Sequence, residues 1–431
     1  MEEKFLYHIW DESHLATDLK TVSGKDLKIH YQGQFNTTFR GPDFVNAIIS
    51  LDGEDLQGAV EIHQNTQDWL KHNHHEDVYY NQVILHIVLN HNSIQPYTMK
   101  ENGEFIEILE LKNQLSEEIQ KLITDIGDRK LSSGNDYCDL LSAIDNDRLF
   151  SILTLYGKQR FMSKVRRFNA SLAISDFDQV LYEGMMEAAG YDKNKFNLFQ
   201  LAQSIPFIKL REWHKEGLMS EEMISIFVGS SSLLQKSRNR ISPELYEKLM
   251  CNYESQRFYA RNLNVDWQLF RIRPGNHPIF RLILLGEFLY NCLPAGLLNF
   301  FVSNVEALTP NPQKRYQNFC QQFQQKQRGL LQNSKSLGST VVNNIYINIY
   351  LPIIYLYYQK MANAEMLESV LESYLTFKAL PENYITRFMC NHINSSQVKA
   401  VNNKTLYQQG LIDIYYRFCR YHLCSECVKN I

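Results

Sequence analysis

The chain has 431 residues, 44% hydrophobic and 21% charged, which is typical of a globular protein with two or three domains. Its formal net charge of −3 excludes a global basic field of the kind that attracts nucleic acid, although a local basic groove remains open. The acidic start, MEEKFLYHIWDESH, lacks the features of a signal peptide, and no apolar stretch is a clean membrane span. With eight scattered cysteines, these features predict a reduced, cytoplasmic protein with no membrane partner.

Strand-like alternation is concentrated near the start of the chain, where nine of the thirteen histidines also lie within 91 residues. We predict a short amphipathic helix over residues 2–10 and strands over 26–32, 44–51 and 57–63. The last two strands are joined by Asp52-Gly53, a hairpin turn signal. A polar helix is predicted over 68–80, a central strand over 83–89 and an edge strand over 105–111.

The pattern becomes helical after about residue 145. We therefore predict an α/β N-terminal domain over 1–115, a connector over 116–145, and a large, mostly α-helical region over 146–431 that ends in a cysteine cluster. No spacing in the sequence indicates an oligomeric state.

The segment GPDFVNAIISLDGEDLQGAVEIH, residues 41–63, has an acid near each end of the predicted hairpin. In an antiparallel hairpin that turns at Asp52-Gly53, paired residue numbers add up to about 105, so Asp43 is expected opposite residue 62. Glu61 and His63 share one face of their strand because side chains alternate with a period of two. Two carboxylates and one imidazole are therefore expected to converge at one end of the hairpin.

Carboxylate oxygens suit Mg²⁺ or Mn²⁺, and an imidazole admits a transition metal or acts as a base. We predict that Asp43 and Glu61 bind a divalent metal and that His63 orients or deprotonates water, which makes these three the candidate catalytic residues. The alternative is a solvated hairpin that carries an acid at each end.

The order of helix, three strands, helix and strand, with Pro42-Asp43 before one strand and Glu61 near the end of the next, resembles the PD-(D/E)XK nuclease fold. The resemblance implies a restriction-endonuclease-like mixed sheet and metal-dependent hydrolysis of phosphodiesters, with Asp43 and Glu61 on the metal. The chain departs from that family at His63, where a lysine usually positions the attacking water or stabilises charge. Histidine is a weaker cation, so the departure bears on catalytic competence more than on the fold.

Histidines are frequent in DWLKHNHHEDVYY, residues 68–80. On a helix, His72 and His75 would share one face and His74 would lie on another. His72 and His74 are candidates for contact with the metal or with a substrate phosphate, whereas the alternative is a solvated helix with a histidine-rich surface. His86, inside the predicted central strand, either joins the site or is a buried polar group that a neighbour satisfies.

Motifs over nearly the full length resemble a bacterial family of domain-of-unknown-function type. They are GPDF at 41–44, GAVEIH at 58–63, DW at 68–69 with His72 and His74, RPGN at 273–276, QGL at 409–411 and the cysteine cluster. This chain departs from the family at TTFR, residues 37–40, where an acid is usual. The resemblance brings no established activity, so function has to be argued from the residues.

Arg273 and Arg281 flank a proline-bounded loop, RIRPGNHPIFR, and form a local basic spot with Arg271. They are candidates for contact with a substrate phosphate or a nucleic-acid partner. The alternative, which we favour, is that these arginines cap helices or bridge the two regions.

Three cysteines, Cys419, Cys424 and Cys427, have the spacing C-x4-C-x2-C. The C-x2-C step is common in zinc and iron–sulfur sites, so either cofactor is a candidate here. A fourth ligand has to come from elsewhere, with candidates at His422, Cys390 and His392. The alternative is a reduced tail.

Three functions remain open. The first is a metal-dependent nuclease whose helical region grips the substrate or a partner, and it requires Asp43 and Glu61 close enough to share one ion. The second is a non-catalytic nucleic-acid- or protein-binding protein on a nuclease-like fold, which His63 and the negative charge favour. The third is a mononuclear metal hydrolase of another substrate class, and it requires an imidazole from residues 68–80 that points at Glu61.

Overall fold

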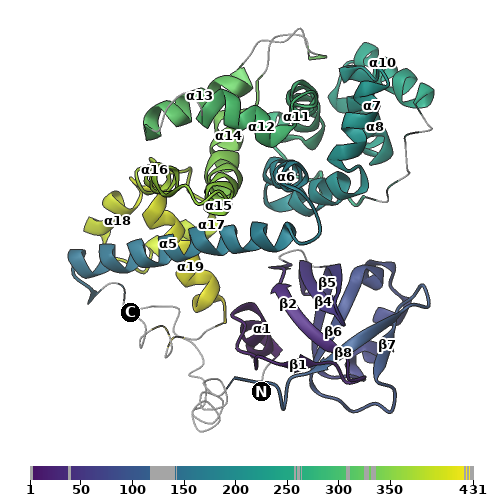
Figure 1. Ribbon diagram of the computed structural model, residues 1–431, viewed down its shortest axis with the longest axis vertical. Helices are drawn as coiled ribbons and strands as arrows, with labels where there is room; N and C mark the ends of the chain where they lie inside the picture. The colour runs from purple at the N-terminus through teal and green to yellow at the C-terminus, as the bar shows by residue number, and fades with distance from the viewer. Residues whose placement is uncertain are drawn as a thin grey trace. The chain divides into compact units, whose positions relative to one another are not determined.

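The structure is a computed structural model that describes residues 3–36, 40–116, 141, 143–256, 259, 263, 265–306, 311–324, 330–331, 336–421, 424 and 427. The chain forms two compact units (Figure 1). We call Met1–Gly157, Asn383–Lys399 and Gln409–Ile431 the sheet unit, and Lys158–Glu382 with Ala400–Gln408 the helical unit. Nearly all of the predicted connector lies outside the described residues.

The predicted α/β part followed by a mostly helical region is confirmed, because the described strands end at Glu110 and every later described element is helical. The boundary between strands and helices along the sequence differs from the boundary between the two compact units. The predicted limits of 1–115 and 146–431 follow the type of element, whereas two segments near the C-terminus pack in the sheet unit.

Eight strands form one mixed sheet in the order β1-β2-β4-β5-β6-β8-β7, with β3 paired to β4. Their bounds are β1 Leu19–Lys20, β2 Asp26–Tyr31, β3 Gln34–Phe35, β4 Phe44–Leu51, β5 Glu54–Asn65, β6 Val83–Asn90, β7 Tyr97–Met99 and β8 Phe105–Glu110. The pairs β2–β4 and β4–β5 are antiparallel, and β5–β6 and β6–β8 are parallel. β6 is the predicted central strand, but the predicted edge position of β8 is wrong because β7 pairs outside it.

A bulge in β4 sets the register at the end of the hairpin. The β4–β5 pairing follows the predicted register from the turn as far as Ala47, which pairs with Gly58. Asn46, with a φ of 60°, then shifts the register by one residue. Asp43 therefore lies opposite Glu61 and not opposite residue 62 as predicted.

The two faces of the sheet are covered by different segments. One face packs against α1 (Glu3–Asp11), which confirms the helix predicted over 2–10. The opposite face is covered by the segment that follows β5, where Trp69 and Tyr80 join a smaller apolar cluster. Because side chains alternate along β5, Glu61 and His63 belong to this second face.

The single polar helix predicted over 68–80 is wrong. The segment contains α2 (Asp68–Lys71) and two 3₁₀ turns, His74–Glu76 and Val78–Gln82. The break falls at Asn73, whose φ of 60° is left-handed, a conformation that asparagine adopts more readily than most residues. Its consequence is that His74 is buried against the sheet and does not lie on a solvated helix face.

The described helices after the sheet have the following bounds: α5 Asn146–Ser171, α6 Phe177–Ser204, α7 Phe207–Lys215, α8 Ser220–Ser230, α9 Leu233–Lys236, α10 Pro243–Ser255, α11 Pro278–Cys292, α12 Leu297–Phe301, α13 Pro312–Gln324, α14 Ser339–Ile345, α15 Leu351–Lys360, α16 Ala364–Leu375, α17 Tyr384–Cys390, α18 Ser395–Val401 and α19 Thr405–Arg417. No single helix among the described residues has the length and apolar composition to cross a membrane. Only together do α11 and the stretch Leu297–Glu306 meet that test, and they are bent by 85°.

The helical unit contains a buried ion pair within its apolar core. Arg315 of α13 donates from Nε and Nη2 to the two carboxylate oxygens of Glu306, at 2.9 and 3.1 Å. The hydroxyl of Tyr350 donates to the same carboxylate at 2.5 Å. Because both charges are paired and hydrogen-bonded, the cost of burying them is offset by their mutual attraction.

The end of the chain bonds to α1 within the sheet unit. Arg417 contacts Glu12, and Arg420 donates to Asp11 at 2.7 Å. The last described segment therefore ties down the C-terminal end of α1.

His8 of α1 is a buried imidazole that packs against His14 and Tyr421, with ring centroids 5.1 and 5.5 Å apart. Burial, with the positive charges of His14, Arg417 and Arg420, lowers the pKa of His8 from 6.5 to about 3. The unfolded chain therefore takes up a proton at a higher pH than the folded chain does.

We expect this imidazole to make the protein less stable in mild acid. Its contribution is intact above pH 6.5 and is lost as the pH falls toward 3, because only the unfolded state is protonated in that range. Between pH 7.5 and 5, His8 is expected to remove about 2 kcal/mol from the free energy of unfolding. His8→Leu should lose correspondingly less, as measured by urea unfolding at both pH values. Equal losses in the two proteins would contradict this account.

Candidate functional site

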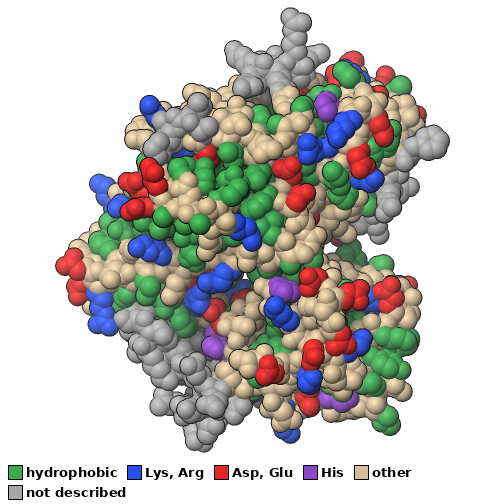
Figure 2. All heavy atoms as spheres, viewed as in Figure 1, with side chains coloured by type: hydrophobic (Ala, Val, Ile, Leu, Met, Phe, Trp, Pro, Cys, Tyr) green, Lys and Arg blue, Asp and Glu red, His purple; other side chains and the backbone are tan. Residues whose placement is uncertain are grey.

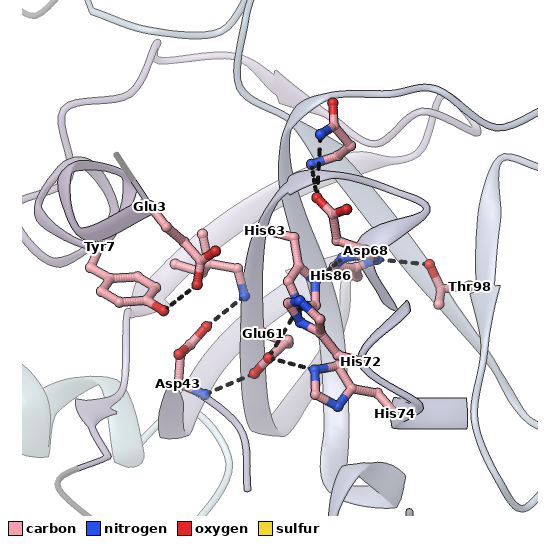
Figure 3. Close-up of polar contacts among 12 residues, drawn as sticks. Glu3, Tyr7, Asp43, Glu61, His63, Asp68, His72, His74, His86 and Thr98 are labelled. Atoms are coloured by element: carbon pink, nitrogen blue, oxygen red, sulfur yellow. Dashed lines mark hydrogen bonds and ion pairs between the residues drawn. The ribbon is translucent and has the colours of Figure 1, made fainter. Parts of the chain in front are cut away.

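The carboxyl groups of Asp43 and Glu61 each accept a backbone hydrogen bond from the opposite strand at the end of the β4–β5 hairpin (Figure 3). The backbone N–H of Asp43 donates to Oε2 of Glu61, and the backbone N–H of Ile62 donates to Oδ2 of Asp43, both at 2.9 Å. The bulge at Asn46 makes this reciprocal arrangement possible, because it brings Asp43 opposite Glu61. The two predicted acids therefore meet.

Burial dominates the electrostatics of both acids. Burial raises the pKa of Glu61 to about 8, even though the N–H of Asp43 favours its charged form. Burial, followed by repulsion from Glu61, raises the pKa of Asp43 well above its usual value. The hydroxyl of Tyr7, which donates to Glu3 at 2.7 Å, also lies beside Asp43. The site thus contains carboxyl groups that a bound cation would stabilise in their charged form.

Two imidazoles, those of His63 and His74, face the other oxygen of Glu61, and the imidazole of His72 lies beside that of His63. Nε2 of His74 lies 3.2 Å from Oε1 of Glu61, and Nε2 of His63 lies 3.5 Å from it. Nε2 of His63 is also 3.1 Å from Nδ1 of His72. One ring nitrogen from each histidine lies within 4.8 Å of the other two. Figure 3 shows the three rings close to one another, with Glu61 beside His63 and His74.

Three of these separations fit those between neighbouring ligands of one metal ion. Zinc–nitrogen bonds of about 2.0 to 2.1 Å in a tetrahedral site separate neighbouring ligand atoms by about 3.3 Å. The three contacts among Glu61, His63, His72 and His74 measure 3.1, 3.2 and 3.5 Å. His63 and His74 are buried, whereas His72 is exposed, so the cluster is open to solvent on one side.

A second observation, a buried nitrogen on His74 that is unpaired within the described part of the chain, indicates that the cluster has room for a further ligand partner such as a metal ion. This nitrogen, Nε2, has no hydrogen-bond partner among the described residues, because the contact with Glu61 is not aligned as a hydrogen bond. Burial lowers the pKa of His74 to about 4 and that of His63 to about 3, so both imidazoles are neutral near pH 7. A neutral imidazole with a free lone pair is the form that binds a metal.

Neighbouring side chains fix the cluster in place. Oδ2 of Asp68 accepts a hydrogen bond from the backbone N–H of Asn65 at 2.9 Å, which joins the end of β5 to α2 and so locates His72. The ring of Tyr80 stacks on His74 with centroids 3.7 Å apart. Trp69 donates from Nε1 to the carbonyl of Met99 at 3.1 Å and covers His74 from another side.

Sequence reasoning missed some of the groups at this site. His86 was expected either in the site or as a buried, satisfied polar group, and it contacts both His63 and Thr98. Nothing in the sequence pointed to Thr98. Glu3 and Tyr7 were also missed, although the amphipathic helix predicted over 2–10 carried the only available signal.

The predicted basic spot lies in the helical unit. Arg273 is exposed, and Arg281 is buried with its guanidinium 3.5 Å from the ring centroid of Tyr191. Nη1 of Arg281 donates to the carbonyl of Ala189 at 2.8 Å. This contact joins α11 to α6 within the helical unit, so it is not the bridge between the two regions that the alternative considered. Phosphate contact by Arg273 and Arg281 stays a prediction.

The cysteine cluster is described only in part. Sγ of Cys419 lies 3.8 Å from Sδ of Met389, Cys424 is exposed and Cys427 is buried. The candidate ligand His422 lies outside the described residues. Zinc or iron–sulfur binding at these cysteines therefore stays a prediction.

The fold and the site define a protein with a mixed-sheet unit that carries a histidine–carboxylate cluster, followed by a mostly helical region. The chain belongs to the family described as "Protein of unknown function (DUF2851)", whose model matches residues 3–383. This match confirms the family resemblance inferred from the motifs. No curated protein and no solved structure matches the chain.

We expect His72 to contribute to zinc affinity. Replacing it in His72→Gln removes one imidazole from the cluster while the fold is retained, because the side chain is exposed. The zinc affinity, measured by competition with a chromophoric chelator, should fall by more than the about 10- to 100-fold that changes outside the ligand shell cause.

His75 provides the matched control, since it lies in the same 3₁₀ turn as His74 but outside the cluster. His75→Gln should leave the zinc affinity unchanged. Equal affinities for wild type and His72→Gln would remove His72 from the site.

Proposed function

We propose that the chain is a metal-dependent hydrolase whose metal ion is held by Glu61, His63, His72 and His74. The observation that carries the proposal is that Nε2 of His74 and Nε2 of His63 lie 3.2 and 3.5 Å from one oxygen of Glu61, while Nδ1 of His72 lies 3.1 Å from Nε2 of His63. This is the arrangement required by the mononuclear hydrolase considered from the sequence, because His74 points at Glu61. Such an ion supplies Lewis-acid activation of water and of a phosphoryl or carbonyl oxygen.

The ligand set favours a transition metal over Mg²⁺. Imidazole suits zinc and related ions, whereas Mg²⁺ prefers an octahedral shell of oxygens. We therefore propose zinc or Mn²⁺ as the working ion. Within this arrangement, Asp43 acts by fixing the backbone next to Glu61, and Glu61 faces the ion with Oε1.

We propose a phosphodiester as the substrate class. This step rests on the resemblance to the PD-(D/E)XK fold and is supported by the sheet. The strands β2, β4, β5 and β6 are neighbours in that order, with antiparallel, antiparallel and parallel pairs. Pro42-Asp43 and Glu61 lie at one end of the β4–β5 hairpin, as the motif of that family requires.

A non-catalytic binding protein is the second candidate, and two observations favour it. The carboxyl groups of Asp43 and Glu61 each accept a backbone hydrogen bond, so both have a structural role. On the face of the sheet unit drawn in Figure 2, acidic and basic side chains of the described residues are interspersed and do not gather by sign. A nuclease groove would gather basic side chains.

Hydrolysis of phosphodiesters by the zinc- or Mn²⁺-loaded protein tests the proposal. We expect turnover of bis(p-nitrophenyl) phosphate or of labelled DNA or RNA oligonucleotides. Glu61→Gln should lower the rate at least about 100-fold, because it removes a proposed ligand of the ion that activates water, and changes outside the ligand shell already cost up to about 100-fold. His75→Gln should retain the wild-type rate. A protein that binds metal but hydrolyses none of these substrates would favour the binding role.

A titration of Asp43→Asn distinguishes the histidine-centred site from a site built on the two acids. The asparagine Oδ1 can still accept the hydrogen bond of Ile62, so the hairpin is retained. If the imidazoles hold the ion, Mn²⁺ and zinc should bind Asp43→Asn within a few-fold of wild type in calorimetry. Loss of binding would move the ion to Asp43 and Glu61.

A further inference from the structure

A line of buried hydrogen bonds leads away from the histidine cluster into the sheet. Nδ1 of His63 lies 2.9 Å from Nε2 of His86, and Nδ1 of His86 lies 2.8 Å from Oγ1 of Thr98. His86 is 0% exposed and Thr98 is 7% exposed. The three side chains come from β5, β6 and β7, and Figure 3 shows the line running from His63 through His86 to Thr98.

The direction of these hydrogen bonds decides which nitrogen of His63 can bind a cation. An imidazole that binds through Nε2 carries its hydrogen on Nδ1. That hydrogen then has His86 Nε2 as its acceptor, and the hydrogen on His86 Nδ1 has Thr98 Oγ1. If the hydrogen bonds ran in the opposite direction, Nε2 of His63 would carry the hydrogen. That nitrogen would then have no lone pair for a cation beside Glu61 and His72.

Packing holds His86 in the orientation that this chain needs. The rings of His63 and His86 are nearly perpendicular, at 87°, with centroids 5.1 Å apart. Trp69 packs against His86 with ring centroids 5.2 Å apart. Because one nitrogen of His86 faces His63 and the other faces the hydroxyl of Thr98, a neutral ring can accept at one nitrogen while it donates at the other.

We infer that His86 is a positioning residue that presents Nε2 of His63 to the metal ion, with Thr98 fixing the tautomer of His86. The inference rests on the proposed function and names two residues outside its ligand set. The partner of a metal-binding imidazole is usually a carboxylate, a backbone carbonyl or water. Here a second imidazole takes that place, because the sheet positions β6 next to β5 and excludes water from the contact.

The test compares zinc affinities of paired variants. His86→Phe keeps an aromatic ring but removes the acceptor for His63, and zinc affinity should fall about 10- to 100-fold. His86→Gln offers an amide oxygen to His63 and an amide N–H to Thr98, so it should restore most of the affinity. The visible spectrum of the Co²⁺-substituted protein should change in His86→Phe and return in His86→Gln.

Thr98 provides a second pair in case His86→Phe does not fold. Thr98→Val has nearly the same shape and removes the hydroxyl, so zinc affinity should fall, whereas Thr98→Ser should retain it. If His86 and Thr98 had only a structural role, the variants would have a lower melting temperature but an unchanged zinc affinity and Co²⁺ spectrum. That result would overturn the inference. If the wild-type protein binds neither zinc nor Mn²⁺, the proposed function and the inference are overturned together. Wild-type binding with unchanged variants would overturn the inference alone.

Discussion

The carboxyl group of Glu61 joins the two parts of the site, because its oxygens face in different directions. Oε2 accepts the backbone N–H of Asp43 and so closes the end of the β4–β5 hairpin. Oε1 faces His63 and His74 on the sheet face covered by the segment after β5. A buried carboxyl group with only one of these contacts would be poorly compensated for the loss of water. The hairpin and the histidine cluster therefore depend on the same side chain.

The position of Glu61 depends on the bulge at Asn46. Without the extra residue, Asp43 would face residue 62, whose side chain packs on the α1 face. The bulge moves Asp43 along by one position, and the exchange of two backbone hydrogen bonds with the strand of Glu61 follows. Bulges beside functional sites commonly re-aim a side chain in this way. A local irregularity in one strand thus determines the arrangement of the candidate site.

Local patterns were sufficient to predict β2, β4, β5 and β6, since β2 shows period-two alternation and β6 is a nearly continuous apolar run. The Asp52-Gly53 turn fixed most of the register of the β4–β5 pair. Alternation also placed Glu61 and His63 on one face. The approach failed between residues 68 and 80, because a single left-handed residue, Asn73, breaks a segment whose composition suits a helix. It also failed for Thr98, which reaches His86 only through the pairing of β7 outside β8. Such contacts depend on tertiary pairing, which local periodicity does not encode.

The bonds between α1 and the end of the chain have a consequence for synthesis on the ribosome. Glu12 and its partner Arg417 are 405 positions apart. At the usual pace of about 5 to 20 residues per second, the first helix emerges about 20 to 80 s before the arginine that pairs with it. A nascent chain can form the whole sheet in that interval, but Asp11 and Glu12 stay unpaired until the last segment arrives. A product of interrupted translation would therefore contain every strand that the structure describes and still lack the contacts that hold α1, which distinguishes it from the finished protein.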